Sequence, residues 1–468
     1  MNFFPTKSLI LGLLLTGSIL SCRVKNNSDP TPSGSGVDTS NVAVNNWIYD
    51  NMKYWYLWTD KMPEKAKTNL NQNPDDYFYT LLNDYPNTDR FSWIQKSSDE
   101  LTASLNGINK VFGMKYSTYY LDNNQKNVGF FVTYVIKGSP AEKAGLKRGD
   151  IILTINGTQL DVDNYRTLPT VETATFGLGK VSNGVFSLSG STVQVTKAEV
   201  QDNPVHYWTV IEKGNKKIGY LVYSQFISTF DNNLRQVFGE FKSKGVNELV
   251  LDLRLNPGGY ISSADLMASL IVKNLNTNNV IHSDEWNANV SKDRPGYLAP
   301  TKFKDEANNL GTLNRLFVLT STGTASASEL VINGLRPYMD VILIGDHTYG
   351  KNVGSVTLQD SQKRWKWGMQ PIVLKTVNSK GESNYGTKDG FPANYAVKDN
   401  VIPYKAWGDE SETLLKKAIE LITGQTTTLQ VAPNARVSVS QLKNEPLQVN
   451  ESENPYQNRK EMYTTFPK

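Results

Sequence analysis

Between residues 201 and 424 the chain alternates two kinds of hydrophobic pattern. Short apolar runs rich in β-branched residues predict buried strands, and runs with apolar residues three and four positions apart predict helices between them. Strands that alternate with helices indicate an α/β domain with much parallel sheet. The predicted strands are 216–226, 248–255, 315–321 and 341–345, and the predicted helices are 233–243, 263–272 and 327–335.

The rest of the chain divides into segments with other patterns. Residues 41–105 are dense in tryptophan and tyrosine and predict short amphipathic helices around an aromatic core. Residues 106–200 are strand-rich, with turn signals such as Asn156-Gly157. Residues 425–468 are polar and weakly patterned, so we expect a flexible tail or a strap over the surface.

Residues 1–22 have the pattern of an export signal. Lys7 precedes an apolar run, 8–20, that is too short for a spanning helix, and Cys22 follows in a sequence that resembles the bacterial lipoprotein cleavage box. Cys22 is the only cysteine of the chain, which a lipid-anchored N-terminus explains; a stray cysteine beside an ordinary signal peptide is the alternative. The polar residues 23–40 predict a flexible linker. We therefore expect an exported bacterial lipoprotein, anchored to the membrane and facing the periplasm or the cell surface.

Composition and charge exclude several classes of protein. Hydrophobic residues make up 39% and aromatic residues 10% of the 468 residues, which is ample for several folded cores. The formal net charge is +4, without a block rich in lysine and arginine, so we expect no nucleic-acid binding. After the export signal no run reaches the roughly 18 apolar residues of a spanning helix, so we expect membrane contact through the N-terminal lipid anchor only.

Ser326 and Lys351 carry the candidate chemistry. Ser326 lies where the predicted strand 315–321 turns into the predicted helix 327–335, and Lys351 lies just past the predicted strand 341–345. Because a right-handed β-α-β unit brings the ends of two parallel strands to one edge of a sheet, the two side chains can meet there. A serine oxygen needs a neighbour to take its proton, and burial can lower a lysine pKa from about 10.4 by roughly 3–5, which makes the neutral amine available.

Four motifs, in order along the chain, resemble one protein family. GSPAEKAGLKRGDIILTINGTQL (138–160) is similar to the second half of a PDZ domain. LVLDLRLNPGG (249–259), TASASE (324–329) and GDHTYGK (345–351) resemble motifs of the C-terminal processing, or tail-specific, serine peptidases. The resemblance covers about 41–424, including the aromatic segment that ends in DRFSWI. It implies a multidomain protein with an α/β catalytic core of the crotonase/ClpP-like type and mostly parallel sheet, a β-rich PDZ domain and a small helical N-terminal domain.

The resemblance also implies roles for single residues. It makes Ser326 the nucleophile and Lys351 the general base of a serine endopeptidase that needs no cofactor. Attack on an amide creates an oxyanion, which needs preorganised N–H donors. The Ala327 amide is one candidate, because it lies in the first turn of a helix. The family points to the Gly258-Gly259 loop for the second donor, with Gly258 slightly favoured, because two glycines let the backbone approach a substrate closely.

The PDZ-like segment implies that the protein captures substrate C-termini. Its carboxylate-binding loop corresponds to Phe112, Gly113 and Met114, whose backbone amides would receive a terminal carboxylate. We expect the strand 129–136 to pair with the peptide by β-augmentation. The expected partners are proteins or peptides with apolar, unstructured C-termini, which the catalytic domain (201–424) would cut near those ends.

Departures from the family pattern leave alternatives open. Many members have a glutamine four residues after the lysine, where this chain has Ser355. Because a serine side chain is shorter, Ser355 either holds the lysine amine closer to its own backbone or does not contact it. The PDZ loop retains a single glycine, Gly113. A catalytically weak or inactive PDZ scaffold that binds protein C-termini is therefore one alternative. A ligand-binding or acyl-transfer protein of the same broad α/β type is another.

A histidine-based or metal-based mechanism is the remaining alternative. The chain has three histidines, of which His347 is four residues before Lys351 and next to Asp346. We expect His347 to be a loop residue at the edge of the site. The sequence has no HExxH motif and no cysteine–histidine cluster with metal-ligand spacing, so we expect no metal.

Overall fold

The signal peptide and most of the linker that the sequence predicts, Cys22 included, lie outside the described residues. Residues 39–468 fall in one compact unit. No helix within the described residues is long and apolar enough to cross a bilayer. The computed structural model of the chain describes residues 40–122, 124–182, 184–399, 401–425, 437–438 and 461–466.

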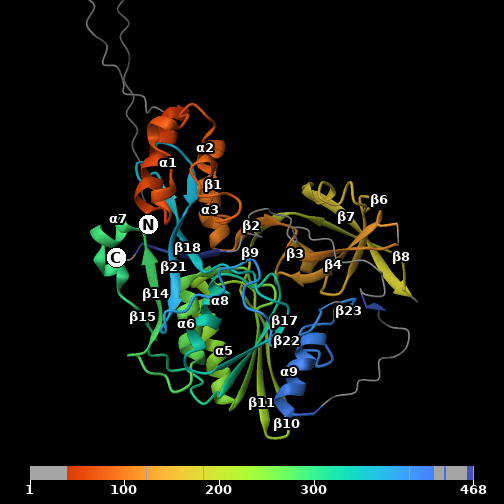
Figure 1. The fold of residues 1–468 in the computed structure, drawn as a ribbon. Helices are drawn as coiled ribbons and strands as arrows, with labels where there is room; N and C mark the ends of the chain where they lie inside the picture. Colours follow the sequence, from red (N-terminus) through yellow and green to blue (C-terminus); the bar gives the residue numbers. More distant parts are fainter. Residues whose placement is uncertain are drawn as a thin grey trace, which may run out of the picture. The chain divides into compact units, whose positions relative to one another are not determined.

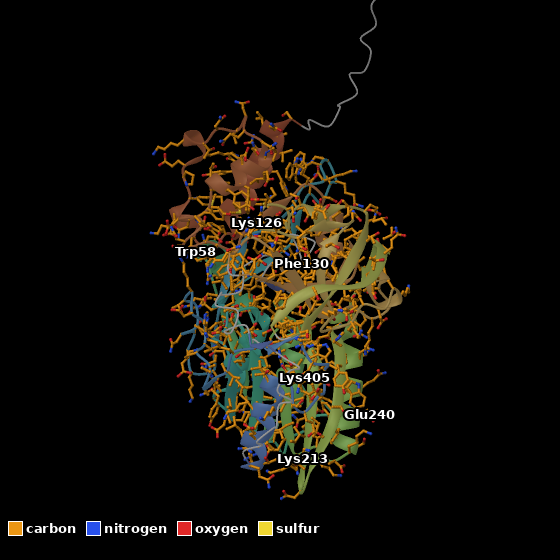
Figure 2. All side chains as sticks on the ribbon, turned by 90° about the vertical axis from the view of Figure 1, so that its right-hand side faces the viewer. Trp58, Lys126, Phe130, Lys213, Glu240 and Lys405 are labelled. Atoms are coloured by element: carbon orange, nitrogen blue, oxygen red, sulfur yellow. The ribbon has the colours of Figure 1, made fainter. Side chains whose placement is uncertain are left out.

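The alternating pattern of residues 201–424 folds into a six-stranded sheet with the order β10-β11-β12-β16-β17-β22. β10 and β11 form an antiparallel hairpin, whose turn lies beside Lys213 (Figure 2), and the other neighbours are parallel. β12 is buried along its whole length, as expected for a strand with both faces covered. The strands are β10 Val205–Lys213, β11 Lys216–Tyr223, β12 Glu248–Asp252, β16 Arg315–Thr320, β17 Asp340–Gly345 and β22 Tyr395–Ala396.

Helices cover both faces of this sheet. Leu249 and Leu251 of β12 pack in one core with α5, α6 and α8, whereas Val250 packs in another core with α9, because successive strand residues point to opposite faces. α6 and α8 run side by side (Figure 1). The predictions of three helices and four strands in this region are confirmed to within three residues at each end. The helices are α5 Asp231–Ser243, α6 Ile261–Ile271, α8 Ala327–Leu335 and α9 Thr413–Thr423.

A second six-stranded sheet is mixed and was not expected from the sequence. Its order is β13-β25-β18-β21-β14-β15, in which β25 is parallel to both of its neighbours and the other three pairs are antiparallel. Several of its strands have only two to four residues, too few to show a period of two. The strands are β13 Gly258–Tyr260, β14 Val280–Trp286, β15 Thr301–Lys302, β18 Val353–Val356, β21 Ile372–Asn378 and β25 Glu461–Thr464.

β25 comes from the segment for which the sequence predicts a polar tail or a surface strap. Met462 and Tyr463 are nevertheless completely buried inside the second sheet. The polar composition of the segment as a whole conceals these few apolar positions. A second piece of the segment, β24 (Val437–Ser438), pairs with β23 (Val401–Ile402).

Residues 114–196 form an antiparallel sheet with the order β3-β4-β5-β7-β8, in which β6 pairs with β5. Phe130, labelled in Figure 2, lies in the core of this sheet and stacks on Tyr116 with 3.9 Å between the ring centroids. The edge strands are β3 and β8, whereas β4 is paired on both sides; our expectation that 129–136 accepts a peptide is therefore wrong. The elements are β3 Met114–Tyr120, β4 Val128–Val135, α4 Pro140–Lys143, β5 Ile151–Ile155, β6 Thr158–Gln159, β7 Thr173–Ser182 and β8 Val185–Thr196.

The aromatic N-terminal segment is helical and shares a core with the first six-stranded sheet. The Ser40 side chain accepts a hydrogen bond from the Ala43 amide at the start of α1 (Asn41–Trp55), whose apolar face is buried. Short sheets connect this segment to the others. The further elements are α2 Pro74–Thr80, β1 Trp93–Gln95, α3 Ser98–Leu105, β2 Ile108–Val111, β9 Ala198–Gln201, α7 Ala288–Asp293, β19 Leu358–Gln359 and β20 Gly368–Gln370.

Candidate functional site

Ser326 lies at the sharp turn between β16 and α8. Its backbone is left-handed, with φ +65° and ψ −115°, a conformation that costs a non-glycine residue about 1–3 kcal/mol. The Thr324 hydroxyl connects the turn to the end of β12, because it donates a hydrogen bond to the Leu253 carbonyl at 2.8 Å. Ser326 is completely buried, and its Oγ has no hydrogen-bond partner among the described residues. A strained serine with an unsatisfied hydroxyl is typical of a functional position.

Glu329 connects the turn of Ser326 to the loop of Lys351. Its Oε2 accepts hydrogen bonds from the Ser326 amide at 2.7 Å and from the Lys351 amide at 2.9 Å. Its Oε1 accepts from the Gly350 amide at 2.7 Å and from the Thr348 hydroxyl. One buried carboxylate therefore fixes the backbones of two residues that are 25 positions apart in the sequence.

Two opposing effects act on the pKa of the Glu329 carboxyl. Complete burial raises the pKa of this carboxyl from 4.5 to about 7, although the hydrogen bonds from Thr348 and from three amides favour the ionised form. Only the carboxylate can accept all four hydrogen bonds, because a protonated oxygen becomes a donor. The geometry of the turn is thus coupled to a group that titrates near neutral pH.

Lys351 is completely buried in the loop between β17 and β18. Its Nζ lies 5.0 Å from the centroid of the Phe91 ring. The preceding Gly350 has φ +87°, and a Cβ there would lie 1.6 Å from the Thr387 carbonyl oxygen, so only glycine fits. The sequence therefore places the lysine after a turn that no larger residue can make.

Arg90 supports the same loop from the N-terminal segment. Its guanidinium donates to the Gly350 carbonyl at 2.9 Å and lies 4.7 Å from the centroids of both the Phe91 and Tyr349 rings. A planar cation between two rings also limits the movement of the rings. Arg90 and Phe91 thus form one wall of the site.

The glycine loop after β12 packs against the turn of Ser326. The Asn256 carbonyl accepts a hydrogen bond from the Ala325 amide at 3.1 Å. Gly258 has φ +110°, and its amide donates to Asn256 Oδ1 at 2.9 Å. Gly259 has φ +137°, and a Cβ there would lie 2.1 Å from the Phe226 carbonyl oxygen. The Gly258 amide thus has an acceptor, and Gly259 pairs with Met462 in the second sheet, so neither glycine is preferred as the oxyanion donor.

Arg254 anchors the start of this loop. Its buried guanidinium forms ion pairs with Asp252 at 2.9 Å, Glu412 at 2.7 Å and Asp399 at 2.8 Å. Burial acts to lower the pKa of Arg254, but these three carboxylates hold it well above its ordinary value. The Arg254 carbonyl in turn accepts a hydrogen bond from the Ser321 hydroxyl at 2.6 Å, which connects the loop to the serine turn.

Two other residues considered from the sequence, Ser355 and His347, have hydrogen-bond partners elsewhere. The Ser355 hydroxyl donates to the Met462 carbonyl of β25 at 3.3 Å. His347 Nδ1 donates to the Thr348 carbonyl at 2.8 Å, which directs the ring toward its own loop. Neither side chain has a described hydrogen bond to Ser326 or Lys351, so the structure does not assemble a serine–histidine pair.

The predicted carboxylate-binding loop of the PDZ-like sheet lies between β2 and β3. Gly113 has φ +95°, and its carbonyl accepts a hydrogen bond from the Ile136 amide at 2.8 Å. The Phe112 and Met114 side chains are buried in the core of this sheet. Neither of these two side chains is therefore exposed to a ligand.

Three contributors to the site were missed from the sequence. Glu329 could have been found, because Ser-x-x-Glu at the start of an apolar helix is the pattern of a capping box. Arg254 and Arg90 gave no local signal, because their partners lie far away in the chain. Among the described residues, no group of three or more acidic, histidine or cysteine side chains could hold a metal ion.

Comparison with known families matches three segments of the chain. The family described as Peptidase family S41 matches residues 217–386, the Peptidase S41 N-terminal domain matches 43–93, and a PDZ domain matches 131–169. The first of these segments contains Ser326 and Lys351.

Similar proteins include a CtpA-like serine protease of Staphylococcus epidermidis, 25% identical over 308 residues that make up 61% of this chain and 58% of the relative. A carboxyl-terminal-processing protease of Picosynechococcus is 27% identical over 312 residues, 64% of this chain and 67% of the relative. The match to the staphylococcal relative thus spans less than two thirds of its length. A crystal structure from Bacteroides fragilis, named as an S41 protease, covers 81% of this chain and 98% of its own, with 27% identity and a TM-score of 0.70. The chain is a member of peptidase family S41 that carries an S41 N-terminal domain and a PDZ domain.

Proposed function

We propose that this chain is a serine endopeptidase that uses Ser326 and Lys351 to cut exported proteins near their C-termini. The observation that carries the proposal is the bridge formed by Glu329, which binds the backbone amides of both residues. A nucleophile and a base must be held in one geometry, and such a bridge supplies it. The names of the Staphylococcus and Picosynechococcus relatives support the same reaction class.

In the proposed reaction, Ser326 Oγ attacks the carbonyl carbon of a peptide bond and Lys351 Nζ takes its proton. The negative oxygen that forms is stabilised by amide N–H groups, for which Ala327, Gly258 and Gly259 are the candidates. Lys351 then returns the proton to the leaving amine, the C–N bond breaks, and water hydrolyses the ester on Ser326. Ser326 Oγ has no hydrogen-bond partner among the described residues, which fits this scheme, because catalytic hydrogen bonds are often long before substrate binds.

The PDZ domain would present the substrate to this site. In our proposal the backbone at Gly113 receives the terminal carboxylate of an apolar, unstructured C-terminus, and β3, an edge strand, pairs with the peptide. We further assign the catalytic core to the crotonase/ClpP-like type, supported by its parallel sheet with helices on both faces.

Export and lipid attachment complete the proposal. Lys7, the apolar run and Cys22 support an exported lipoprotein held at the membrane by its N-terminus. Radiolabelled palmitate should enter the protein expressed in bacteria, and the Cys22→Ser variant should take up none. Equal labelling of the two proteins would contradict the anchor.

A binding scaffold without useful activity is the second candidate function. The observation that favours it is the position of Ser355, whose hydroxyl contacts Met462 where family members carry a glutamine that assists the lysine. Such a protein would bind C-termini through its PDZ domain and leave them intact.

Cleavage of an unstructured protein that ends in apolar residues separates the two functions. We expect the full chain to cut it, and Ser326→Ala and Lys351→Ala to lower the rate about 10³-fold or more. Lys351→Arg should be equally inactive, because arginine stays protonated. Lys375→Arg, at a half-exposed lysine that pairs with Glu285, is the control and should keep full activity.

Binding without cleavage by all of these proteins would establish the scaffold. An active Lys351→Arg variant would rule out the lysine as base while leaving Ser326 as nucleophile. The fragments are identified by mass spectrometry, which also tells whether the cut lies near the C-terminus.

A further inference from the structure

β25 occupies a position that a peptidase of the proposed kind needs for its substrate. It lies between β13, which begins at Gly258 in the glycine loop, and β18, which begins two residues after Lys351. In the parallel register Glu461 is opposite Gly258, and Tyr463 is opposite both Tyr260 and Ser355. The start of β25 is therefore level with the two loops that carry the candidate oxyanion donor and the base.

Backbone pairing holds β25 on both sides. β13 and β18 have no described pairing with each other, so the strand fills a slot that is one strand wide. The Ser355 hydroxyl adds a hydrogen bond to the Met462 carbonyl. Contacts of this kind depend on the peptide backbone and accept many sequences, which is how added strands are recognised by sheet edges.

Side chains of β25 add apolar anchors. Met462 packs in the main core, and the Tyr463 ring lies 4.2 Å from that of Tyr260 and donates its hydroxyl hydrogen to the Leu105 carbonyl at 2.7 Å. Two residues beyond the strand, the Phe466 ring lies 4.6 Å from that of Trp55. An extended segment with apolar side chains matches the apolar, unstructured class of substrate proposed above.

We propose that the slot between β13 and β18 is a binding site for extended C-terminal peptides, and that residues 461–466 are its intramolecular ligand. The inference rests on the proposed function, because it takes the slot as the place where a substrate lies beside Ser326. A substrate then has to displace this segment. The covalent connection gives the segment a high effective concentration, so the slot is closed in most molecules.

Peptide binding tests the proposal without requiring catalysis. The probe is a fluorescent peptide with the sequence of residues 461–468, amidated at its C-terminus so that it offers no carboxylate to the PDZ loop. Binding is measured by anisotropy to Ser326→Ala in its full length and to the same variant ending at Lys460. If the slot is free in about 0.1–10% of full-length molecules, removal of the strand should strengthen binding about tenfold or more.

Hydrogen exchange locates the peptide. Amides of 258–260 and 353–356 should exchange faster in the shortened chain and become protected again when the peptide is added. Equal binding to the two chains would overturn the proposal, and so would protection elsewhere. A folded shortened chain that does not bind the peptide would show that β25 is only a structural strand.

A second variant covers the case in which the shortened chain does not fold. Tyr463→Ala with Phe466→Ala, in full-length Ser326→Ala, loosens the anchors and should also strengthen peptide binding. Tyr395→Ala is the control, because Tyr395 is 40% exposed and Phe466 38%. Unchanged binding in the double variant would contradict the proposal. Because every arm uses Ser326→Ala, lack of cleavage by the wild type would count against the proposed function alone.

Discussion

Two buried charges lie on either side of Ser326, and they are neutralised in different ways. Arg254, beside the glycine loop, is surrounded by three carboxylates. Glu329, beside the lysine loop, accepts hydrogen bonds from four neutral groups. Ion pairing keeps Arg254 charged at any pH at which the protein folds, whereas burial leaves the pKa of Glu329 at about 7. One side of the site is thus a permanent anchor and the other responds to pH.

Removal of Arg254 should have the largest effect on stability. Arg254→Ala leaves Asp252 and Glu412 buried without their cation, so we expect the free energy of unfolding to fall by about 3–5 kcal/mol. The measurement is urea unfolding, followed through the transition of the catalytic sheet. Lys244→Ala is the control, because that lysine and its partner Glu240 are both about half exposed, and the pair should contribute at most about 1 kcal/mol. Similar losses in both variants would remove the contrast between a buried and an exposed anchor.

The pH response of Glu329 should be smaller and should have a definite sign. Because its folded pKa of about 7 exceeds the ordinary 4.5, the protonated form favours folding; this stabilisation, about 3 kcal/mol, is complete below pH 4.5 and lost as the pH rises to 7. Activity should change in the opposite direction and rise through pH 7, since only the carboxylate accepts all four hydrogen bonds. The infrared band of a protonated carboxyl should disappear with a midpoint near pH 7 and be missing in Glu329→Gln.

Lys351, as the proposed base, and the histidines are the alternative sources of a rise in activity near pH 7, so the carboxyl band is the measurement specific to Glu329. Burial lowers the pKa of His206 to about 3. Burial also acts to lower the pKa of His282, but the carboxylates of Asp265 and Asp284 outweigh it and raise that pKa to about 10. His347→Asn therefore serves as the control and should keep the rise in activity. A carboxyl band with a midpoint near pH 4.5 would show that the hydrogen bonds outweigh burial and that both charges are permanent.

The smallest effect is expected at Arg90, which contacts the Lys351 loop on the pH-dependent side of the site. Arg90→Lys keeps the charge but loses the planar group that donates to the Gly350 carbonyl between two rings, so we expect kcat/KM to fall about tenfold. Arg166→Lys, at an exposed arginine beside Tyr165, is the control. Full activity of Arg90→Lys would show that Glu329 alone is sufficient to hold the lysine loop.

Local patterns of the sequence predicted much of the catalytic domain. The apolar runs of β12 and β16 and the periodic positions of α8 depend on neighbours within a few residues, so strands, helices and the positions of Ser326 and Lys351 could be read from them. The pairing of β25 with β13 could not, because partners some 200 residues apart leave no local trace. The edge of the PDZ sheet was misplaced for the same reason: burial along a strand does not reveal how many strands flank it.

The contact between Phe91 and Lys351 bears on how such proteins can be recombined. Phe91 belongs to the stretch that matches the S41 N-terminal domain, and Lys351 to the stretch that matches the peptidase family. The two stretches look like interchangeable modules in sequence, with a PDZ domain between them. A chimera that exchanges one stretch for that of a distant relative would place different side chains around Lys351. The two stretches share a contact at the proposed base, so we expect that they have to be exchanged together even though another domain separates them.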